Sequence, residues 1–257
     1  MLKAQLKSEL IKSSTSVVWW GVGVATVLIS IVVCSFFTFA GLNVSSSPID
    51  ANDPRLVDTL LTLGFSLSYM LLLILGVLSF NLEFQNKTIL YSLVGNPRRS
   101  VLYSVKLASA ALSNAFFAAL LCVSSLGIVS IISYTSERDV KFFPYQIMLT
   151  LVSLVVVSSL VGVIGASIGA MTDKLINVVV FIILWIQVIE PVVQIAAPQG
   201  VRKFLPSSLI DASLGGGFLG KIFGISPLSQ MTALGVMALA AISIALVGWG
   251  QFRKKEF

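Results

Sequence analysis

The chain has 257 residues, of which 56% are hydrophobic and only 11% are charged. Soluble domains carry roughly 25% charged residues, so this composition excludes a water-soluble globular protein and indicates an integral membrane protein. The sequence contains no histidine, which removes histidine-based acid–base catalysis and histidine-ligated metal sites from consideration. The net charge is +6, and the placement of the basic residues is more informative than their sum.

The first 14 residues form a basic segment ahead of the first apolar run. Leucines recur in it at four-residue steps and share one helix face: Leu2, Leu6 and Leu10. We therefore expect a short helix on the cytoplasmic membrane surface, with a frayed basic tail as the alternative. The apolar run that follows is longer than the roughly 7–15 residues of a signal-peptide core, so we expect it to be retained as a span.

Six apolar runs reach the length of about 20 residues that crosses a bilayer as a helix. They are Val17–Ala40, Val57–Leu82, Leu107–Ser133, Gln146–Met171, Leu175–Ala197 and Leu228–Gly250. The runs lack the alternation of a β-barrel, and open sheets do not form in lipid. We predict an all-α integral membrane protein with one domain of six transmembrane helices over residues 1–257. Cys34 and Cys122 lie inside these runs and should pack as small apolar side chains rather than form a disulfide.

The longest polar interruption, from Glu83 to Lys106, separates the second run from the third. Four of its apolar residues fall on one face of a short helix: Ile89, Leu90, Leu93 and Val94. Glu83 precedes Lys87 by four residues, which is the favourable order for an ion pair on a helix. Gly95 and Pro97 are expected to end the helix. We predict an amphipathic helix outside the bilayer, with an apolar face that docks on a partner.

The basic residues predict the orientation of the chain in the membrane. With both termini in the cytoplasm, eleven of the seventeen lysines and arginines lie on the cytoplasmic side. They include Arg98, Arg99 and Lys106, which lead into the third run. The positive-inside rule therefore places both termini and the segment from Glu83 to Lys106 in the cytoplasm.

The fifth loop, Pro198–Pro227, is rich in glycine and too apolar for a solvated linker. We expect short helices there that dip back into the membrane edge. Gly215 to Lys221 reads GGGFLGK, which satisfies the phosphate-loop pattern and a dinucleotide-binding pattern. However, Ile222 stands where a phosphate loop needs Ser or Thr for magnesium, and no β-strand precedes it. We interpret the stretch as a glycine-rich turn, and we expect this chain to bind no nucleotide cofactor and no metal.

Two further features are candidate sites inside the spans. Glu190 lies late in the fifth run, near its external end, and an ionisable residue within a span is a functional candidate by default. It either lines a substrate path or reaches water at the helix end. Gly162, Gly165 and Gly169 recur at three- and four-residue steps in the fourth run, which predicts close helix packing within the subunit or across a dimer.

Together these features resemble the permeases of ABC-2 type transporters. The resemblance rests on the basic amphipathic N-terminus, the six spans and an E-x(4)-T segment from Glu83 to Thr88. An N-P-R-R sequence before the third span and Leu205-Pro206 early in a long apolar external loop agree with it. The resemblance covers essentially the full length in layout. The family pattern often has glycine before the threonine, where this chain has Lys87.

The resemblance implies a half-transporter of the inner (plasma) membrane, in a bacterium. Two permease subunits, as a homodimer or a heterodimer, form the path for an exported amphipathic or hydrophobic compound such as a peptide antibiotic, a drug or a lipid. Two separate cytoplasmic ATPase subunits bind ATP and magnesium. They dock on a coupling segment that comprises Glu83, Lys87, Thr88, Ile89, Leu90, Leu93, Val94, Arg98 and Arg99. Membrane lipid is an expected partner, and nucleic acid is not.

Two other classes of function are alternatives. A secondary transporter or channel without an ATPase would be expected to bury more charge in its spans or to show an internal repeat. A membrane enzyme needs a cluster of nucleophile, base or metal ligands, and the sequence shows none. We therefore expect a permease subunit without catalytic residues of its own.

Overall fold

The computed structural model describes residues 2–43, 56–95, 98–135, 144–215 and 224–255, and all regular secondary structure in these ranges is helical. The helices are α1 (Leu2–Thr15), α2 (Val17–Asn43), α3 (Leu56–Gln85), α4 (Ile89–Gly95), α5 (Arg99–Thr135), α6 (Pro144–Met171), α7 (Leu175–Leu184), the π-helical segment η1 (Trp185–Ile189), α8 (Glu190–Ala196), α9 (Gln199–Arg202), α10 (Pro206–Ser213) and α12 (Gln230–Phe252). Six helical runs are long and apolar enough to span a membrane, which confirms the predicted all-α membrane architecture.

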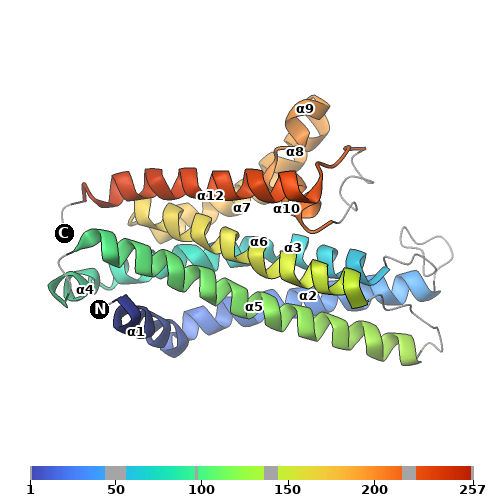
Figure 1. Cartoon of the computed structure of the whole chain (residues 1–257), viewed down its shortest axis with the longest axis horizontal. Coiled ribbons are helices and arrows are strands. Elements are labelled where there is room, and N and C mark those ends of the chain that lie inside the picture. The colour runs from blue at the N-terminus through green and yellow to red at the C-terminus, as the bar shows by residue number, and fades with distance from the viewer. Residues whose placement is uncertain (1, 44–55, 96–97, 136–143, 216–223, 256–257) are drawn as a thin grey trace.

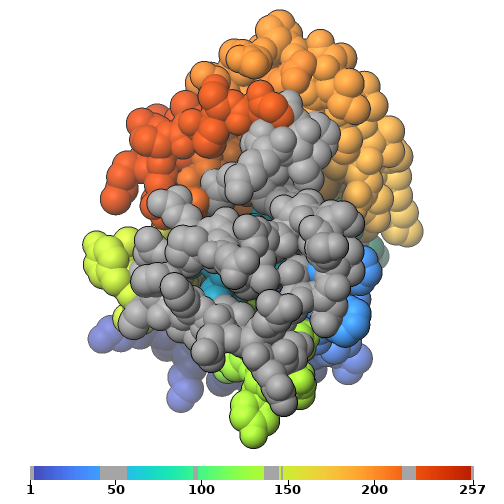
Figure 2. Space-filling model, turned by 90° about the vertical axis from the view of Figure 1, so that its right-hand side faces the viewer, coloured from blue at the N-terminus to red at the C-terminus, as the bar shows by residue number. Residues whose placement is uncertain are grey.

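The long helices run side by side, and both termini and α4 lie at the same end of the bundle (Figure 1). Helix α3 is central and packs against α2, α5 and α6. Its core residues include Phe65, Leu72 and Phe80, all fully buried. Helices α7 to α9 lie at one edge of the molecule, as the view onto the opposite end shows (Figure 2).

The glycines of the fourth span bring α6 against its neighbours within the same chain. A Cβ atom on Gly165 would lie 2.2 Å from the Leu73 carbonyl oxygen, and one on Gly169 would lie 2.6 Å from another carbonyl oxygen of α3. A Cβ atom on Gly162 would lie 2.2 Å from the Asn114 side chain of α5. All three positions require glycine for internal packing. These contacts correspond to the first of the two predicted roles, packing within the subunit.

Helix α5 begins earlier than the third apolar run predicts. It starts at Arg99 rather than at Leu107, and its 37 residues make it about 55 Å long. The hydrocarbon core of a bilayer is only about 30 Å thick, so α5 continues beyond it. Hydropathy missed this extension because the first two turns carry Arg99 and Lys106, whose polar groups bind other parts of the chain.

The fifth span contains a π-helical turn, and the chain then returns to the bundle. The π-helical segment η1 separates α7 from α8, where the apolar run predicts one continuous helix. Helix α9 projects away from the bundle, and α10 then folds back beside α12 (Figure 1). All residues from Ser208 to Ser213 are buried.

Several predictions concern residues outside the described ranges. The GGGFLGK stretch is described only at Gly215, which has a left-handed φ of 72° that favours glycine. Most of the first and third predicted external loops also lies outside these ranges. Cys34 and Cys122 are both described; they are free thiols buried in the bundle, as predicted.

Candidate functional site

Helix α4 lies at the end of the bundle that holds both termini, within the predicted coupling segment (Figure 1). Ile89 is buried and packs in a cluster with Phe80, Leu102 and Phe252. Leu93 is partly buried against the same cluster. This underside packs α4 against α5 and places it in a cluster that also holds residues of α3 and α12.

The outer side of α4 is apolar and exposed. Tyr91 is 79% exposed, Val94 is 85% exposed and Leu90 is 45% exposed. The four apolar residues predicted to share one face are therefore divided. Ile89 and Leu93 face the bundle, whereas Leu90 and Val94 are exposed together with Tyr91, which the sequence pattern did not single out. We call Leu90, Tyr91 and Val94 the outer stripe of α4.

The turn between α3 and α4 explains why Glu83 does not pair with Lys87, and why glycine would fit well before Thr88 in the E-x(4)-T segment. Helix α3 ends at Gln85, so Lys87 is not on the same helix as Glu83 and the predicted ion pair between them does not form. Lys87 has a φ of 54°, which is a left-handed conformation that glycine adopts most easily. The Thr88 amide donates to the Glu83 carbonyl oxygen at 3.0 Å and closes the turn.

Glu83 instead belongs to a group of two acids and two bases in which every side chain except that of Lys12 is largely buried. We call this group the four-charge cluster: Glu9, Lys12, Glu83 and Lys106. The Lys106 ammonium lies 2.9 Å from Glu9 Oε2 and 3.0 Å from Glu83 Oε1. Lys12 Nζ lies 2.7 Å from Glu9 Oε1 and 3.0 Å from Glu83 Oε1. The cluster has no net charge, and it joins α1, α3 and α5.

The two lysines of the four-charge cluster differ in their access to water. The Lys106 side chain is 1% exposed, and its ammonium also donates to the Ser79 carbonyl oxygen at 2.9 Å. The Lys12 side chain is 47% exposed and lines a cavity of about 440 Å³ between α1, α3 and α5. An unpaired ammonium at the position of Lys106 would be costly, because it has no water to replace a lost partner.

The charges of the cluster alter the acid–base behaviour of α1. Burial disfavours the charged carboxylate of Glu9, but the charge of Lys106 and hydrogen bonds from Lys12 and Lys106 outweigh burial and hold the pKa of Glu9 below its usual 4.5. Burial also disfavours the charged Lys12, yet hydrogen bonding to Glu9 and the charge of Glu83 raise the Lys12 pKa above its usual 10.5. Glu9 and Lys12 are therefore both expected to be charged near neutral pH.

Ser92 connects the four-charge cluster to α4. Lys12 Nζ donates to Ser92 Oγ at 3.1 Å, and Ser92 Oγ donates to Glu83 Oε2 at 3.4 Å. A shift of α4 would therefore disturb hydrogen bonds to both α1 and α3. Helix α4, which carries the outer stripe, is thus joined to the interior of the bundle by the hydrogen bonds of the Ser92 hydroxyl and by the packing of Ile89.

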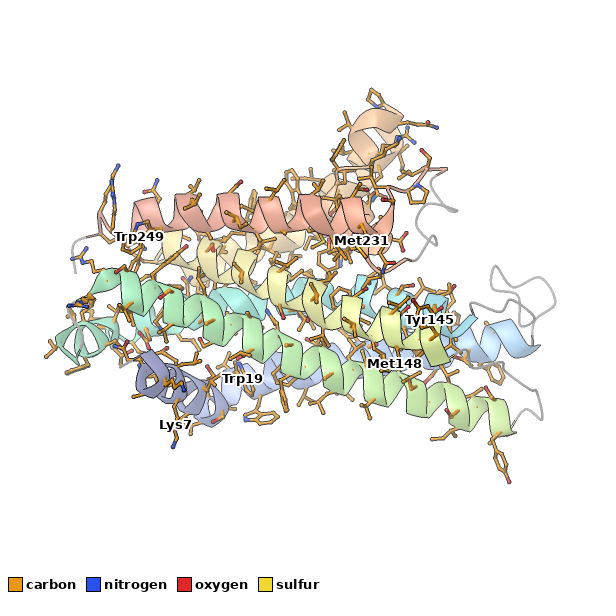
Figure 3. The ribbon with its side chains drawn as sticks, viewed as in Figure 1. Lys7, Trp19, Tyr145, Met148, Met231 and Trp249 are labelled. Atoms are coloured by element: carbon orange, nitrogen blue, oxygen red, sulfur yellow. The ribbon has the colours of Figure 1, made fainter. Side chains whose placement is uncertain are left out.

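Helix α1 turns the carboxylate of Glu9 and the ammonium group of Lys12 toward charged partners in the bundle, whereas a soluble helix turns apolar side chains inward. Glu9 is buried, whereas Ile11 is 52% exposed and Leu6 and Leu10 are partly exposed. Lys7 points away from the bundle (Figure 3). The inward carboxylate of Glu9 forms ion pairs, and the outward apolar side chains of Leu6, Leu10 and Ile11 suit a membrane surface.

The two arginines of the predicted coupling segment lie at the start of α5. Arg99 Nη1 donates to the carbonyl oxygens of Arg253 and Lys255 at 2.9 and 2.7 Å, so it holds the C-terminal end of the chain. The Arg98 carbonyl oxygen accepts the first amides of α5, and the residue is exposed. Arg99 therefore has a structural partner, which the sequence pattern did not predict.

Glu190 lies deeper in the bundle than predicted. It is 2% exposed, and its carboxylate accepts from the Tyr69 hydroxyl at 3.2 Å and from the Ser207 amide at 2.6 Å. Tyr69 is near the middle of α3, so Glu190 contacts the middle of a neighbouring span. A role of Glu190 in lining a substrate path stays a prediction. It receives an amide at the N-terminus of α10, where a negative charge is favourable.

The sequence analysis missed Glu9 and Lys12 as parts of this site. The only local signal is their three-residue spacing on α1, which allows an ion pair. Their contact with Glu83 and Lys106 spans more than 70 residues and has no local pattern. In the part of the chain that the structure describes, no group of three or more cysteine or acidic side chains is placed to hold a metal ion.

Comparison of the sequence with protein-family models and with curated proteins finds no match.

Proposed function

We propose that this chain is the membrane-spanning permease subunit of an ATP-driven exporter of the ABC-2 type. In this proposal two permease subunits form the path through a bacterial inner membrane, with both termini in the cytoplasm. Two separate ATPase subunits supply ATP hydrolysis and dock on α4. The exported compound is amphipathic or hydrophobic.

The observation that carries the proposal is the arrangement of α4. Its outer stripe of Leu90, Tyr91 and Val94 is exposed, while its underside is fixed to the bundle through Ile89. An apolar stripe at the polar end of a membrane protein favours contact with another protein. The hydrogen bonds of Ser92 to Lys12 and Glu83 offer a route by which movement of a docked partner reaches α1 and α3.

The first prediction tests docking at the outer stripe. Leu90→Asp places a charge where an apolar contact is expected. Losing one leucine contact costs roughly 1.5–3 kcal/mol, and burying the carboxylate costs several more. We expect association with the ATPase to weaken by at least about a hundredfold, since each 1.4 kcal/mol is tenfold. The measurement is whether a soluble protein with a phosphate loop co-purifies with the chain, together with transport in membrane vesicles.

Two variants control for insertion and charge. Leu90→Met keeps an apolar side chain and should retain the ATPase, and Gln85→Asp adds the same charge at the exposed end of α3. Both should reach the membrane in normal amounts and transport substrate. If Leu90→Asp still holds the ATPase and transports, α4 is not the docking element. Transport without any ATPase would favour the alternative of a secondary transporter.

A further inference from the structure

An apolar cavity of about 370 Å³ lies between α3, α6, α7, η1, α10 and α12. Its walls include Leu73, Ile168, Ile186, Leu209 and Met237. Among the described residues, the wall side chains with a polar group are Tyr69 and Trp185, and the Tyr69 hydroxyl donates to Glu190. The volume falls within the range of about 300–1,000 Å³ that is usual for sites that hold small ligands.

The cavity lies at the level of the hydrocarbon core and opens to the outside of the bundle. Tyr69 and Leu73 come from the middle of α3, and Met237 to Ile244 come from the middle of α12. Phe181 and Phe204 line the cavity and are 58% and 56% exposed, so they stand at its mouth. The exposed surface of a span at this depth faces acyl chains.

We infer that this cavity holds one acyl chain of a membrane phospholipid, which enters sideways between Phe181 and Phe204. Water does not satisfy the site, because a water molecule needs two to four polar partners. The Tyr69 hydroxyl already donates to Glu190, and the Trp185 indole N–H is the one other polar side-chain group among the described wall residues. An empty cavity would leave its wall atoms without dispersion contacts. A hydrocarbon chain supplies those contacts, and the bilayer provides it at the mouth.

The π-helical segment and Glu190 shape this site. Trp185 and Ile186 of η1 both line the cavity, and a π-helical turn changes the direction of the side chains that follow it. Pro206 and Leu209 line it from α10, whose N-terminus is held by Glu190. The site is thus formed by the π-helical segment η1 and by α10, which returns to the bundle. A helix that only crosses the membrane needs neither feature.

The test uses the full chain in vesicles that contain a phospholipid with a photoreactive group at the end of one acyl chain. After illumination, labelled peptides are identified by mass spectrometry. We expect labelling of the segments Phe181–Ile186 and Leu209–Ile210 to exceed that of Val32 and Phe36, which are 65% and 67% exposed on α2. Labelling spread evenly over all exposed spans would overturn the inference.

A pair of matched variants sharpens the test. Ala240→Phe fills the cavity from α12 and should reduce labelling of the η1 peptide about tenfold, because two excluded methylene groups are worth that much. Ala238→Phe adds the same ring two residues earlier, away from the cavity wall, and should leave the labelling unchanged. Equal labelling of both variants, or equal loss in both, would contradict the assignment. The experiment needs no ATPase, so it can fail or succeed independently of the proposed function.

Discussion

The end of the bundle that holds both termini and the region around α10 bury carboxylates in different ways. Glu9 and Glu83 each contact two lysine ammonium groups. Glu190 contacts only neutral donors, the Tyr69 hydroxyl and the Ser207 amide. The first arrangement ties three helices together by charge, and the second holds the start of one short helix.

The two arrangements should differ in how strongly single substitutions lower the stability of the fold. Charges that compensate one another must all be present, because removing one leaves another buried without a partner. Neutral donors are less demanding, since an amide or hydroxyl that loses its acceptor costs less than an unpaired charge. The four-charge cluster should therefore respond more strongly to single substitutions than Glu190 does.

The largest effect is expected from Lys106→Met. It leaves Glu9 and Glu83 near one another with only Lys12 to compensate them, and breaking a buried pair costs about 3–5 kcal/mol. The free energy of unfolding of the purified chain in detergent should fall by that amount, as measured by chemical or thermal denaturation. Lys7→Met is the control, because Lys7 is exposed and points away from the bundle (Figure 3).

A compensating variant separates charge from packing. Glu9→Gln and Glu83→Gln added to Lys106→Met remove the unpaired carboxylates and should recover part of the lost stability. If the triple variant is less stable than Lys106→Met alone, then the lysine acts through its packing rather than its charge.

Glu190→Leu should have the next largest effect. It leaves the Tyr69 hydroxyl and the Ser207 amide without their acceptor, at a cost of about 3 kcal/mol in unfolding free energy. Glu190→Gln keeps an acceptor oxygen and should lose only about 1 kcal/mol. Gln187→Leu, at an exposed position of η1, is the matched control and should change stability by less than about 0.5 kcal/mol. If Glu190→Leu lowers stability as much as Lys106→Met, then the two regions do not differ as described.

Acidic pH should weaken the four-charge cluster through Glu9. The Glu9 pKa is lower in the folded chain than its usual 4.5, so its contribution is fully present above pH 4.5 and is lost as pH falls through the folded value. At neutral pH Glu9→Gln should cost about 2 kcal/mol, since hydrogen bonds to a charged group are lost. The difference in unfolding free energy between the parent and Glu9→Gln should shrink below pH 4.5.

The control for this pH dependence is Asp173→Asn. Asp173 pairs with Lys255, but its side chain is 67% exposed, and exposed ion pairs contribute little. The stability of Asp173→Asn should follow that of the parent at every pH. A difference between the parent and Glu9→Gln that stays constant down to pH 2 would show that the Glu9 charge is not what stabilises the cluster.

The smallest effect is expected in the turn that leads from this cluster to α4. Lys87→Gly relieves the unfavourable left-handed conformation of Lys87, but glycine also gives the unfolded chain more conformational freedom. The net effect should be a rise of about 0.5–1 kcal/mol in the free energy of unfolding. Lys87→Ala keeps the unfavourable conformation and should give no gain. Equal stability of the two variants would mean that the turn relaxes at no cost.

Hydropathy was sufficient to predict the six spans, because the requirement for apolar length in a bilayer is local. The close packing of α6 was predicted for the same reason, since Gly162, Gly165 and Gly169 share one helix face by their spacing alone. Whether that face meets the same chain or another depends on tertiary structure. In the structure these glycines contact α3 and α5 of the same chain.

The candidate site was less predictable because its key contacts are long-range. Helical periodicity placed Leu90 and Leu93 on one face, but a helix of seven residues that lies on a bundle exposes one of them and half-buries the other. Glu83 was paired with Lys87 by sequence spacing, although a turn intervenes and the true partners are Lys12 and Lys106. Nothing near Glu190 in the sequence indicates that it binds the amide of Ser207, seventeen residues later.

The order of residues in the four-charge cluster has a consequence for biosynthesis. A chain is made from its N-terminus, so Glu9, Lys12 and Glu83 all leave the ribosome before Lys106 does. Lys106, the base that becomes fully buried, is thus the last of the four to be synthesised. Both of its acidic partners, Glu9 and Glu83, have left the ribosome by then. Insertion of α5 can bury Lys106 directly into an ion pair, without a stage in which its charge stands alone in lipid. Helices α1, α2, α3 and α5 can therefore assemble as a unit while the second half of the protein is still being synthesised.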